Sequence, residues 1–313
     1  MSRGGRSGER PMVPVATFDS YYGRPVIKSP VWRSPDIPGY LFLGGLAGAS
    51  SVLGAGASLT GRPALARVAK VSSALSTALG GVALVHDLGR PARFLNMLRV
   101  VKPTSPMNVG SWILSTYGAA TAVAAGTDVT GLFPRVGRVS TMSAAVLGPL
   151  LASYTGALLA DTAVPAWHDG YREMPFVFAA SGSAAAGGLG LLAAPLDQAG
   201  PARRMAVIGG TCELAALVAM RRRMGLTAEP YRDGRAGSYT RAAEVLGLVG
   251  TAGAAIAGRR SRAGAAACGL ALLTGSAATR WAVFHAGLQS ASDPRYTVEP
   301  QRRRLAARRS AVA

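Results

Sequence analysis

Eight long apolar runs dominate this 313-residue sequence and limit the folds that it can adopt. Each run is close to the roughly 20 residues that a helix needs to cross about 30 Å of hydrocarbon. In lipid, every backbone N–H and C=O group must be satisfied within its own segment, and the runs are too long and too uniformly apolar for barrel strands. We therefore predict an all-α integral membrane protein with about eight transmembrane helices, over residues 37–58, 66–86, 108–127, 139–161, 172–194, 203–220, 239–258 and 263–285.

The composition supports a helical bundle in a membrane. Only 16% of the residues are charged, against about 25% in an average soluble domain. The chain also holds 40 glycines, and small residues let helix backbones approach closely in a membrane. The net charge of +19 lies in short loops between the apolar runs rather than in a continuous groove, so we expect contact with membrane lipids and no nucleic-acid partner.

The runs divide the chain into three parts. Residues 1–36 form a polar N-terminal arm on the membrane face and lack the apolar core of a cleavable signal peptide, residues 37–285 form the transmembrane domain, and residues 286–313 form a basic C-terminal tail. Loops on the side of the termini carry 23 Lys and Arg residues, against 9 on the other side. Because positive loops remain inside, we expect a multi-pass protein of the cell (inner) membrane with both termini in the cytoplasm.

Polar clusters gather at one level of this predicted bundle. Residues 86–94 follow the second apolar run directly and place several ionisable groups at a membrane–water boundary. Residues 32–40, 105–112 and 161–175 fall at the same level, before the first run, at the start of the third and after the fourth. The later runs are plainer and rich in Ala, Gly and Leu. We therefore predict a functional N-terminal half of four helices and a supporting second half.

Four motifs in these clusters resemble those of the NrfD/polysulphide reductase membrane-subunit family. They are YLFLGGLAG at 40–48, HDLGRP at 86–91 with RFLNML at 93–98, SPMNVGSW at 105–112, and YTG at 154–156 with PAWH at 165–168. The resemblance covers roughly residues 30–180. It implies a haem-free membrane anchor of a complex iron–sulfur molybdoenzyme, which exchanges electrons with a membrane quinone or quinol, either menaquinone or ubiquinone. The implied partners are a ferredoxin-like four-cluster iron–sulfur subunit and a molybdopterin catalytic subunit.

The cysteines agree with placing any iron–sulfur cluster in another subunit. Cys212 and Cys268 both lie inside apolar runs, and the sequence has no CxxC motif. We therefore expect neither haem nor an iron–sulfur cluster nor a metal site in this chain. The family's best-known members face the periplasm, whereas the charge bias places this polar face in the cytoplasm.

The candidate quinone pocket lies between the ends of the first, second and fourth predicted helices. A quinone carbonyl could accept a hydrogen bond from His86 while Asp87 supplies or takes a proton. In the fourth helix, Tyr154 and Asp161 share one stripe with Leu158 at the spacing i, i+4, i+7. The predicted quinone-binding and proton-transfer residues are Tyr40, His86, Asp87, Tyr154 and Asp161.

A purely structural interpretation of these residues is also open. The ionisable groups can mark a helix end that directs its charges into water, with Arg90 offsetting the helix dipole. Tyr154 can be an aromatic anchor at the interface. The same holds for Trp32, Tyr40, Trp112 and Trp167, which more often serve as belt residues than as walls of a ring-binding site, with Tyr40 kept as the exception because it begins the motif YLFLGGLAG.

Other charged residues fall into two groups. A loop-face group is predicted to help dock the iron–sulfur subunit and comprises Arg90, Arg93, His168, Arg172 and Glu173. A deeper group, Lys70, Glu213, Glu244 and Arg280, must face the bundle interior or reach toward the interface. For Glu213, a proton path and a structural hydrogen bond between helices remain equally open.

Two other function classes compete with the quinone anchor. A b-type haem cytochrome would require pairs of axial histidines, and the sequence has only His86, His168 and His285. A transporter or a scaffold without a redox role is the second alternative, although broken helices near the bilayer centre are not evident.

Overall fold

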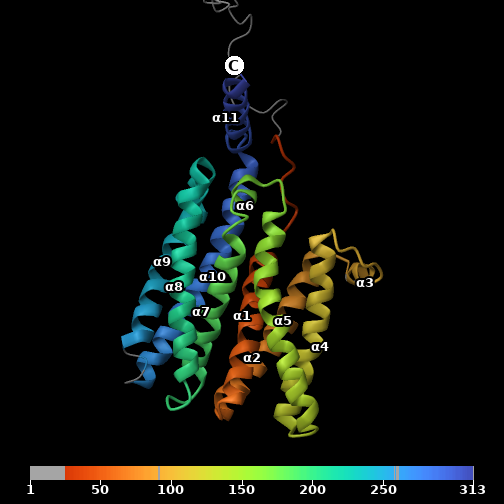
Figure 1. Cartoon of the computed structure of the whole chain (residues 1–313), viewed down its shortest axis with the longest axis vertical. Coiled ribbons are helices and arrows are strands. Elements are labelled where there is room, and N and C mark those ends of the chain that lie inside the picture. The colour runs from red at the N-terminus through yellow and green to blue at the C-terminus, as the bar shows by residue number, and fades with distance from the viewer. Residues whose placement is uncertain (1–24, 91, 257, 259–260, 313) are drawn as a thin grey trace, which may run out of the picture.

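The computed structural model describes residues 25–90, 92–256, 258 and 261–312, and these residues form helices and connections without strands (Figure 1). Much of the predicted N-terminal arm, residues 1–24, lies outside the described residues. Eight helices of 20 residues or more run along the long axis of the molecule, and consecutive ones run in opposite directions. They are α1 (Asp36–Leu59), α2 (Pro63–Asp87), α4 (Pro106–Thr130), α5 (Pro134–Ala160), α7 (Met174–Ala193), α8 (Gly200–Met224), α9 (Gly234–Ile256) and α10 (Arg262–Ser292).

The eight apolar runs correspond one by one to these long helices. In the described part of the chain, four helices, α1, α2, α5 and α7, are long and apolar enough to cross a membrane. The all-helical prediction is therefore confirmed, whereas the count of eight spans is not. The other long helices contain more charged residues or dilute their apolar content with Gly, Ser and Thr, as α8 does with the run Arg221–Arg222–Arg223 in its last turn.

Proline and glycine explain several helix boundaries. α2, α4 and α5 each have a proline in the first turn, where the absent N–H would have no partner within the helix. Gly131 caps the C-terminal end of α4, where its φ of 73° allows its N–H to bond the carbonyl of Thr127. α10 continues to Ser292, and α11 (Arg295–Val312) follows, so the described part of the predicted C-terminal tail is largely helical.

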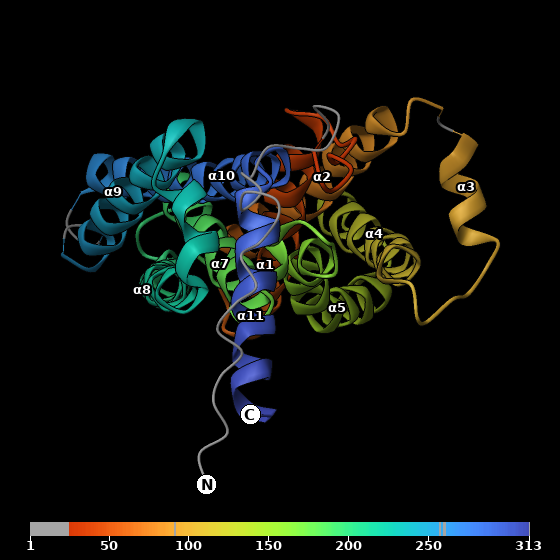
Figure 2. The same cartoon turned by 90° about the horizontal axis from the view of Figure 1, so that it is seen from above.

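Four shorter elements lie at one end of the bundle, which we call the motif end because it carries residues 86–90, α3 and α6. This is the upper end in Figure 1, where α6 and α11 also lie. The view from above in Figure 2 shows α3 standing away from the long helices, beside α4. The shorter elements are α3 (Ala92–Leu98), α6 (Pro165–His168), the 3-10 helix η2 (Gly225–Tyr231) and α11.

Helix α1 is the centre of the packing. It contacts α2, α5, α7 and α10, and its most apolar segment is largely buried within the protein. Glycines make the closest approaches possible: a Cβ atom at Gly48 would lie 2.3 Å from the carbonyl oxygen of Gly148 in α5, and one at Gly182 in α7 would lie 2.6 Å from that of Gly45. Small residues thus bring the backbones of α1, α5 and α7 together, as the composition suggested.

Candidate functional site

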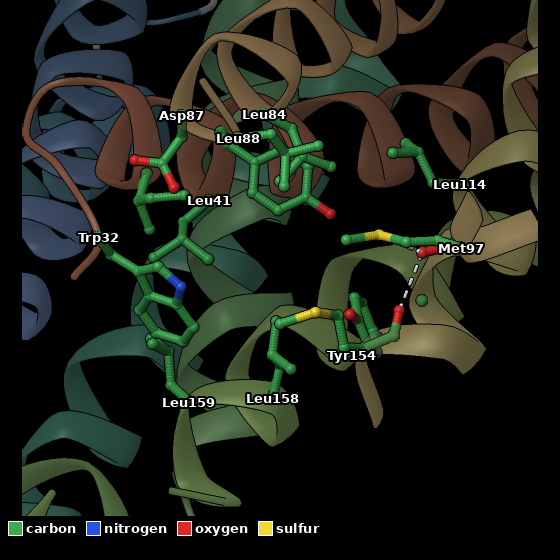
Figure 3. Close-up of a pocket in the computed structure, with 15 residues that line it drawn as sticks. Trp32, Leu41, Leu84, Asp87, Leu88, Met97, Leu114, Tyr154, Leu158 and Leu159 are labelled. Carbon is green, nitrogen blue, oxygen red and sulfur yellow. Dashed lines mark hydrogen bonds between the residues drawn. The ribbon is translucent and has the colours of Figure 1, made fainter. Parts of the chain in front are cut away.

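A mostly apolar cavity opens at the motif end between the four N-terminal long helices. Its free volume is about 70 Å³. α1, α2, α4 and α5 form its walls, α3 contributes Met97, and Trp32 comes from the segment before α1. In Figure 3, Asp87 and Trp32 lie on one side of the cavity, and Met97 and Tyr154 lie on the other. Residues that are far apart in the sequence therefore meet in one site.

Two phenols lie in the wall of this cavity. Tyr40 stands near the start of α1 and is only 5% exposed, and Tyr154 stands near the end of α5. Neither hydroxyl makes a hydrogen bond among the described residues. Leucines of α1, α2, α4 and α5 supply the apolar surface around them: Leu41, Leu84, Leu114 and Leu158. The two hydroxyls are consequently available to a polar ligand in an otherwise apolar cavity.

Asp87 provides the carboxylate of the cavity. It is the last residue of α2, and its Oδ1 accepts a hydrogen bond from the backbone N–H of Arg33 at 3.0 Å. This bond ties the segment before α1 to the end of α2. The second carboxylate oxygen has no hydrogen-bond partner among the described residues, so it can accept or release a proton at the cavity.

His86 points away from the cavity. Its Nδ1 lies 2.8 Å from Oδ2 of Asp36, and its side chain is 74% exposed. Consecutive residues of an α-helix are about 100° apart around the axis, so the inward direction of Asp87 turns its neighbour outward. The structure thus brings Asp87 to the cavity wall and places His86 at the bundle surface.

Asp161 also lies outside the cavity wall. Tyr154 and Leu158 share one stripe and both line the cavity, as predicted. α5 ends at Ala160, and Asp161 is its exposed C-cap residue, whose backbone has left the helix. Of the five predicted quinone-binding residues, the structure therefore brings together Tyr40, Asp87 and Tyr154, and the binding role of all five stays a prediction.

Several cavity residues were missed by the sequence analysis. Met97 and Met107 line the cavity, and so do Gly110 and Ser111 of the motif SPMNVGSW. A Cβ atom at Gly110 would lie 1.9 Å from the hydroxyl oxygen of Tyr154, so this glycine makes room for the phenol. The motif itself was the signal, but it does not reveal that its glycine faces α5.

The tryptophans were expected mainly in an interfacial belt, and for Trp167 this expectation is wrong. Trp167 is 0% exposed, and its Nε1 donates a hydrogen bond to the carbonyl of Val283 in α10 at 2.7 Å. Trp32 stacks on it with ring centroids 5.5 Å apart and also lines the cavity. Trp112 is 39% exposed, which suits an interfacial residue.

The predicted docking residues lie at the motif end, in the α2–α3 and α6–α7 regions. Arg90, Arg93, His168 and Arg172 are exposed. Glu173 is engaged instead, because its carboxylate accepts hydrogen bonds at 2.7 and 2.5 Å from Arg223 of α8. The guanidinium of Arg223 lowers the pKa of Glu173 below its ordinary value. The docking role of these residues stays a prediction.

Each of the deeper charges has partners within the bundle. Lys70 pairs with Asp128 of α4 at 2.8 Å, and Glu244 of α9 pairs with Arg221 of α8. Glu213 accepts a hydrogen bond from Thr279 of α10 at 2.6 Å. This last contact is a structural hydrogen bond between α8 and α10, and a proton path through Glu213 stays a prediction.

Arg280 is the most deeply buried of these charges, at 0% exposure. Its Nη2 donates to the carbonyl of Phe178 at 2.8 Å, its Nε donates to that of Leu41 at 3.3 Å, and its guanidinium lies 3.9 Å from the centre of the Phe178 ring. One side chain of α10 is thereby bound to both α1 and α7.

Metal-binding groups are sparse in the described residues, which contain no cluster of three or more His, Cys, Asp or Glu side chains able to hold a metal ion. The histidines lie apart: His168 contacts the carbonyl of Ala160 at 3.2 Å, and His285 stacks on Tyr239. The titratable groups of the cavity are therefore oxygen groups, which can exchange protons and hydrogen bonds with an organic ligand.

Comparison with known proteins identifies the family. A family model described as polysulphide reductase, NrfD, matches residues 27–232. The chain belongs to the NrfD family. The match extends from the segment before α1 through η2, so it includes every wall of the cavity and also α7 and α8, beyond the region that the four motifs covered. Among curated proteins, none matches the chain.

Membership in the NrfD family defines the general role of the chain. Together with the apolar helices, it shows a multi-pass membrane protein. It also indicates that the chain is a membrane subunit of a redox enzyme complex. Members of this family typically assemble with iron–sulfur and molybdenum catalytic subunits.

Proposed function

We propose that this NrfD protein is the quinone-reactive membrane subunit of a molybdopterin oxidoreductase. It exchanges electrons between a ferredoxin-like four-cluster iron–sulfur subunit and the quinone or quinol pool of the cell membrane. The observation that carries this proposal is the cavity at the motif end, where the phenols of Tyr40 and Tyr154 and the carboxylate of Asp87 lie in a wall that is otherwise mostly apolar. The charge bias supports a cytoplasmic position for the motif end and both termini.

The chemistry of the cavity suits a quinone ring. Such a ring is flat and apolar and has two carbonyl oxygens that accept hydrogen bonds, and its reduction takes up two electrons and two protons. The hydroxyls of Tyr40 and Tyr154 are free to donate to carbonyl oxygens. Asp87, at the end of α2, can pass a proton between the cavity and the surrounding water. The leucine walls would hold the ring and exclude water from it.

The size of the cavity adds a condition to this proposal. A cavity of roughly 150 Å³ holds a benzene molecule, whereas this cavity has a free volume of about 70 Å³. A ring can therefore bind only if side chains move. Met97 is the best candidate, because methionine side chains are flexible and α3, which carries it, has no buried residue. We infer that α3 and Met97 form the movable wall of the site.

The position of the cavity suits electron exchange with a partner. It lies at the end of the bundle, where Arg90, Arg93 and Arg172 are exposed and can attract a partner of opposite charge. A cluster carried by a subunit bound at this end would be close to the ring site. In the neighbouring bilayer, the apolar quinone tail would remain in lipid.

Site-directed variants of the assembled complex test the proposal. Tyr154→Phe removes the hydroxyl, and Asp87→Asn removes proton exchange while keeping the side-chain size. We expect Asp87→Asn to lower quinone-linked turnover about a hundredfold. Reduction of an artificial dye by the partner subunits should remain normal in both variants, and so should co-purification of the subunits.

Matched controls make this experiment specific. Tyr239→Phe in α9 and Asp233→Asn before α9 change partly or fully exposed residues outside the cavity, and we expect normal quinone turnover in both. His86→Gln tests whether His86, which is next to Asp87 in the sequence, contributes to quinone turnover as the sequence analysis predicted. Normal quinone turnover in both Asp87→Asn and Tyr154→Phe would place the quinone site elsewhere and refute the proposal.

A further inference from the structure

The end of the bundle opposite the motif end holds a cluster of cations between α2, α4 and α5. Asp128 lies at its centre and accepts contacts from Lys70 at 2.8 Å and from Arg67 at 3.1 Å. Two open cavities, of about 600 and 300 Å³, meet at this cluster and share Lys70 and Asp128. Arg62 lines the larger cavity, and Arg138 lines the smaller one.

The charges in these cavities are not balanced within the protein. Asp128 is the only carboxylate among the residues that line the two cavities, and Lys70 and Arg67 already occupy its two oxygens. Arg62 has one contact, to the carbonyl of Thr60 at 3.3 Å, and Arg138 makes no hydrogen bond or ion pair among the described residues. Two guanidinium groups therefore remain without a counter-charge, which favours an anion with oxygen acceptors.

An apolar stripe on α2 leads away from these cations. Val68 lines the larger cavity, and Leu75, Leu79 and Val82 follow on the same face of the helix at 58%, 58% and 67% exposure. From Val68 to Val82 this stripe is about 21 Å long at 1.5 Å per residue. That length exceeds the roughly 15 Å of hydrocarbon in one leaflet of a bilayer. Since α2 is long and apolar enough to cross a membrane, this exposed stripe offers an apolar surface to acyl chains.

We propose that this end of α2 is a binding site for an anionic phospholipid. The phosphodiester lies in the cavity lined by Arg62 and Arg67, Arg138 adds attraction from the adjoining cavity, and one acyl chain follows the stripe from Val68 to Val82. A basic recess between membrane helices suits a phosphodiester, because guanidinium groups bind phosphate oxygens through charge-assisted hydrogen bonds. The acyl stripe distinguishes this ligand from free phosphate, which would use the cations alone. The site is independent of the proposed quinone chemistry.

Native mass spectrometry of the purified full-length chain tests this site. The protein is titrated in a neutral detergent with phosphatidylglycerol, with phosphatidylcholine and with inorganic phosphate. We expect selective retention of phosphatidylglycerol and no competition from millimolar inorganic phosphate. Each arginine near a membrane surface contributes about fivefold to binding, so Arg62→Gln/Arg138→Gln should weaken retention roughly 25-fold. The Lys70–Asp128 pair is unchanged in this variant, and the single variants measure the effect if the double variant does not fold.

A matched control removes two arginines elsewhere. Arg304→Gln/Arg308→Gln changes exposed residues of α11, which extends from the motif end along the long axis of the molecule. This control should keep the selectivity for phosphatidylglycerol. Equal retention of phosphatidylcholine would show a non-selective lipid contact, and competition by inorganic phosphate would show a simple anion site. Either result would overturn the proposal, as would unchanged retention in Arg62→Gln/Arg138→Gln.

Discussion

The two halves of the bundle place their polar groups in different surroundings. At the motif end of the α1–α5 half, the hydroxyls of Tyr40 and Tyr154 have no hydrogen-bond partner among the described residues and face a cavity. In the α7–α10 half, Glu213 is bound to Thr279, and Arg280 is bound to two backbone carbonyls. Nη1 of Arg280 and Oγ1 of Thr251 are buried there without a partner among the described residues, but neither residue lines the cavity at the motif end. Polar groups that face a cavity can be completed by a ligand, whereas those that bond across helices hold the helices in place. The contrast supports ligand binding in the first half and helix positioning in the second.

Helix α7 connects the two halves. It packs on α1 and α5 on one side and on α8 and α10 on the other. The family match includes α7 and α8 together with the cavity, whereas α9 and α10, the helix that carries Arg280, lie beyond it. Substitutions in the second half should therefore act on stability, and those near the cavity should act mainly on ligand binding.

Arg280→Met gives the largest expected loss of stability. The change removes two hydrogen bonds that join α10 to α1 and α7 and the contact of the guanidinium with the Phe178 ring. Hydrogen bonds to charged groups contribute about 1.5–3 kcal/mol each, so we expect a large decrease in the thermal midpoint and in the yield of folded protein in detergent. Arg241→Met, on an exposed residue of α9, is the matched control. A wild-type midpoint for Arg280→Met would remove the positioning role of this side chain.

A Gly→Ala change tests the packing in each half of the bundle. In the α7–α10 half, the position for this change is Gly287. A Cβ atom at Gly287 of α10 would lie 1.9 Å from the ring of Trp167. That ring is 0% exposed and is held by its hydrogen bond to Val283, so it cannot move aside. Overpacking of this kind costs about 1–3 kcal/mol, and Gly287→Ala should lower the thermal midpoint accordingly. An unchanged midpoint would show that the Trp167 site is loosely packed.

Gly110→Ala makes the same change in the first half, and its effect should be smaller on stability and larger on function. The added methyl would displace the phenol of Tyr154, which lies beside a cavity and has space to move. We expect the free energy of unfolding to fall by about 1 kcal/mol. We also expect a strong loss of quinone-linked turnover, because the displaced phenol ring of Tyr154 would occupy the space proposed for the quinone. Gly56→Ala, where an added Cβ meets nothing within 4 Å, is the control. Full turnover in Gly110→Ala would contradict the position of the pocket.

These glycines show what the sequence could and could not predict. The length of the apolar runs predicted the long helices, because backbone satisfaction in lipid leaves few alternatives. The stripe of Tyr154 and Leu158 was also predictable, since it depends only on helical spacing. The contact of Gly110 with Tyr154, and that of Gly287 with Trp167, were not, because each joins helices whose pairing and rotation no local pattern specifies.

The predicted pocket residues show the same limit at the helix ends. His86 and Asp87 are adjacent, and the sequence cannot say which of the two turns inward. Asp161 continues the spacing of the Tyr154 stripe, but α5 ends one residue earlier, at Ala160. The short helices α3 and α6 lack the length that made the long helices recognisable. Helical spacing therefore predicted which residues share a face inside a helix, but not which residues of a terminal turn face the cavity.

The smallest expected effect concerns the ion pair between Glu173 and Arg223, which joins the start of α7 to the end of α8. Because Arg223 lowers the pKa of Glu173, the pair stabilises the folded protein at pH values above the pKa of an unfolded glutamate, about 4.3. This contribution is lost as the pH falls through the lower, folded-state pKa. Glu173→Gln should therefore lower the stability by about 1 kcal/mol at pH 7, and the difference from wild type should shrink as the pH falls below about 4.3.

Unfolding midpoints of the two proteins in the same detergent, measured from pH 7 down to pH 3, test this dependence. Arg223→Gln is the matched partner: because Arg223 also donates to the carbonyl of Asp169, a pair that acts as one unit predicts that the double variant is about as stable as Arg223→Gln alone. A difference between wild type and Glu173→Gln that stays constant over this range would mean that the carboxylate acts through packing instead of charge. In that case the contact between α7 and α8 at the motif end would depend on shape alone, as the buried glycine contacts deeper in the bundle do.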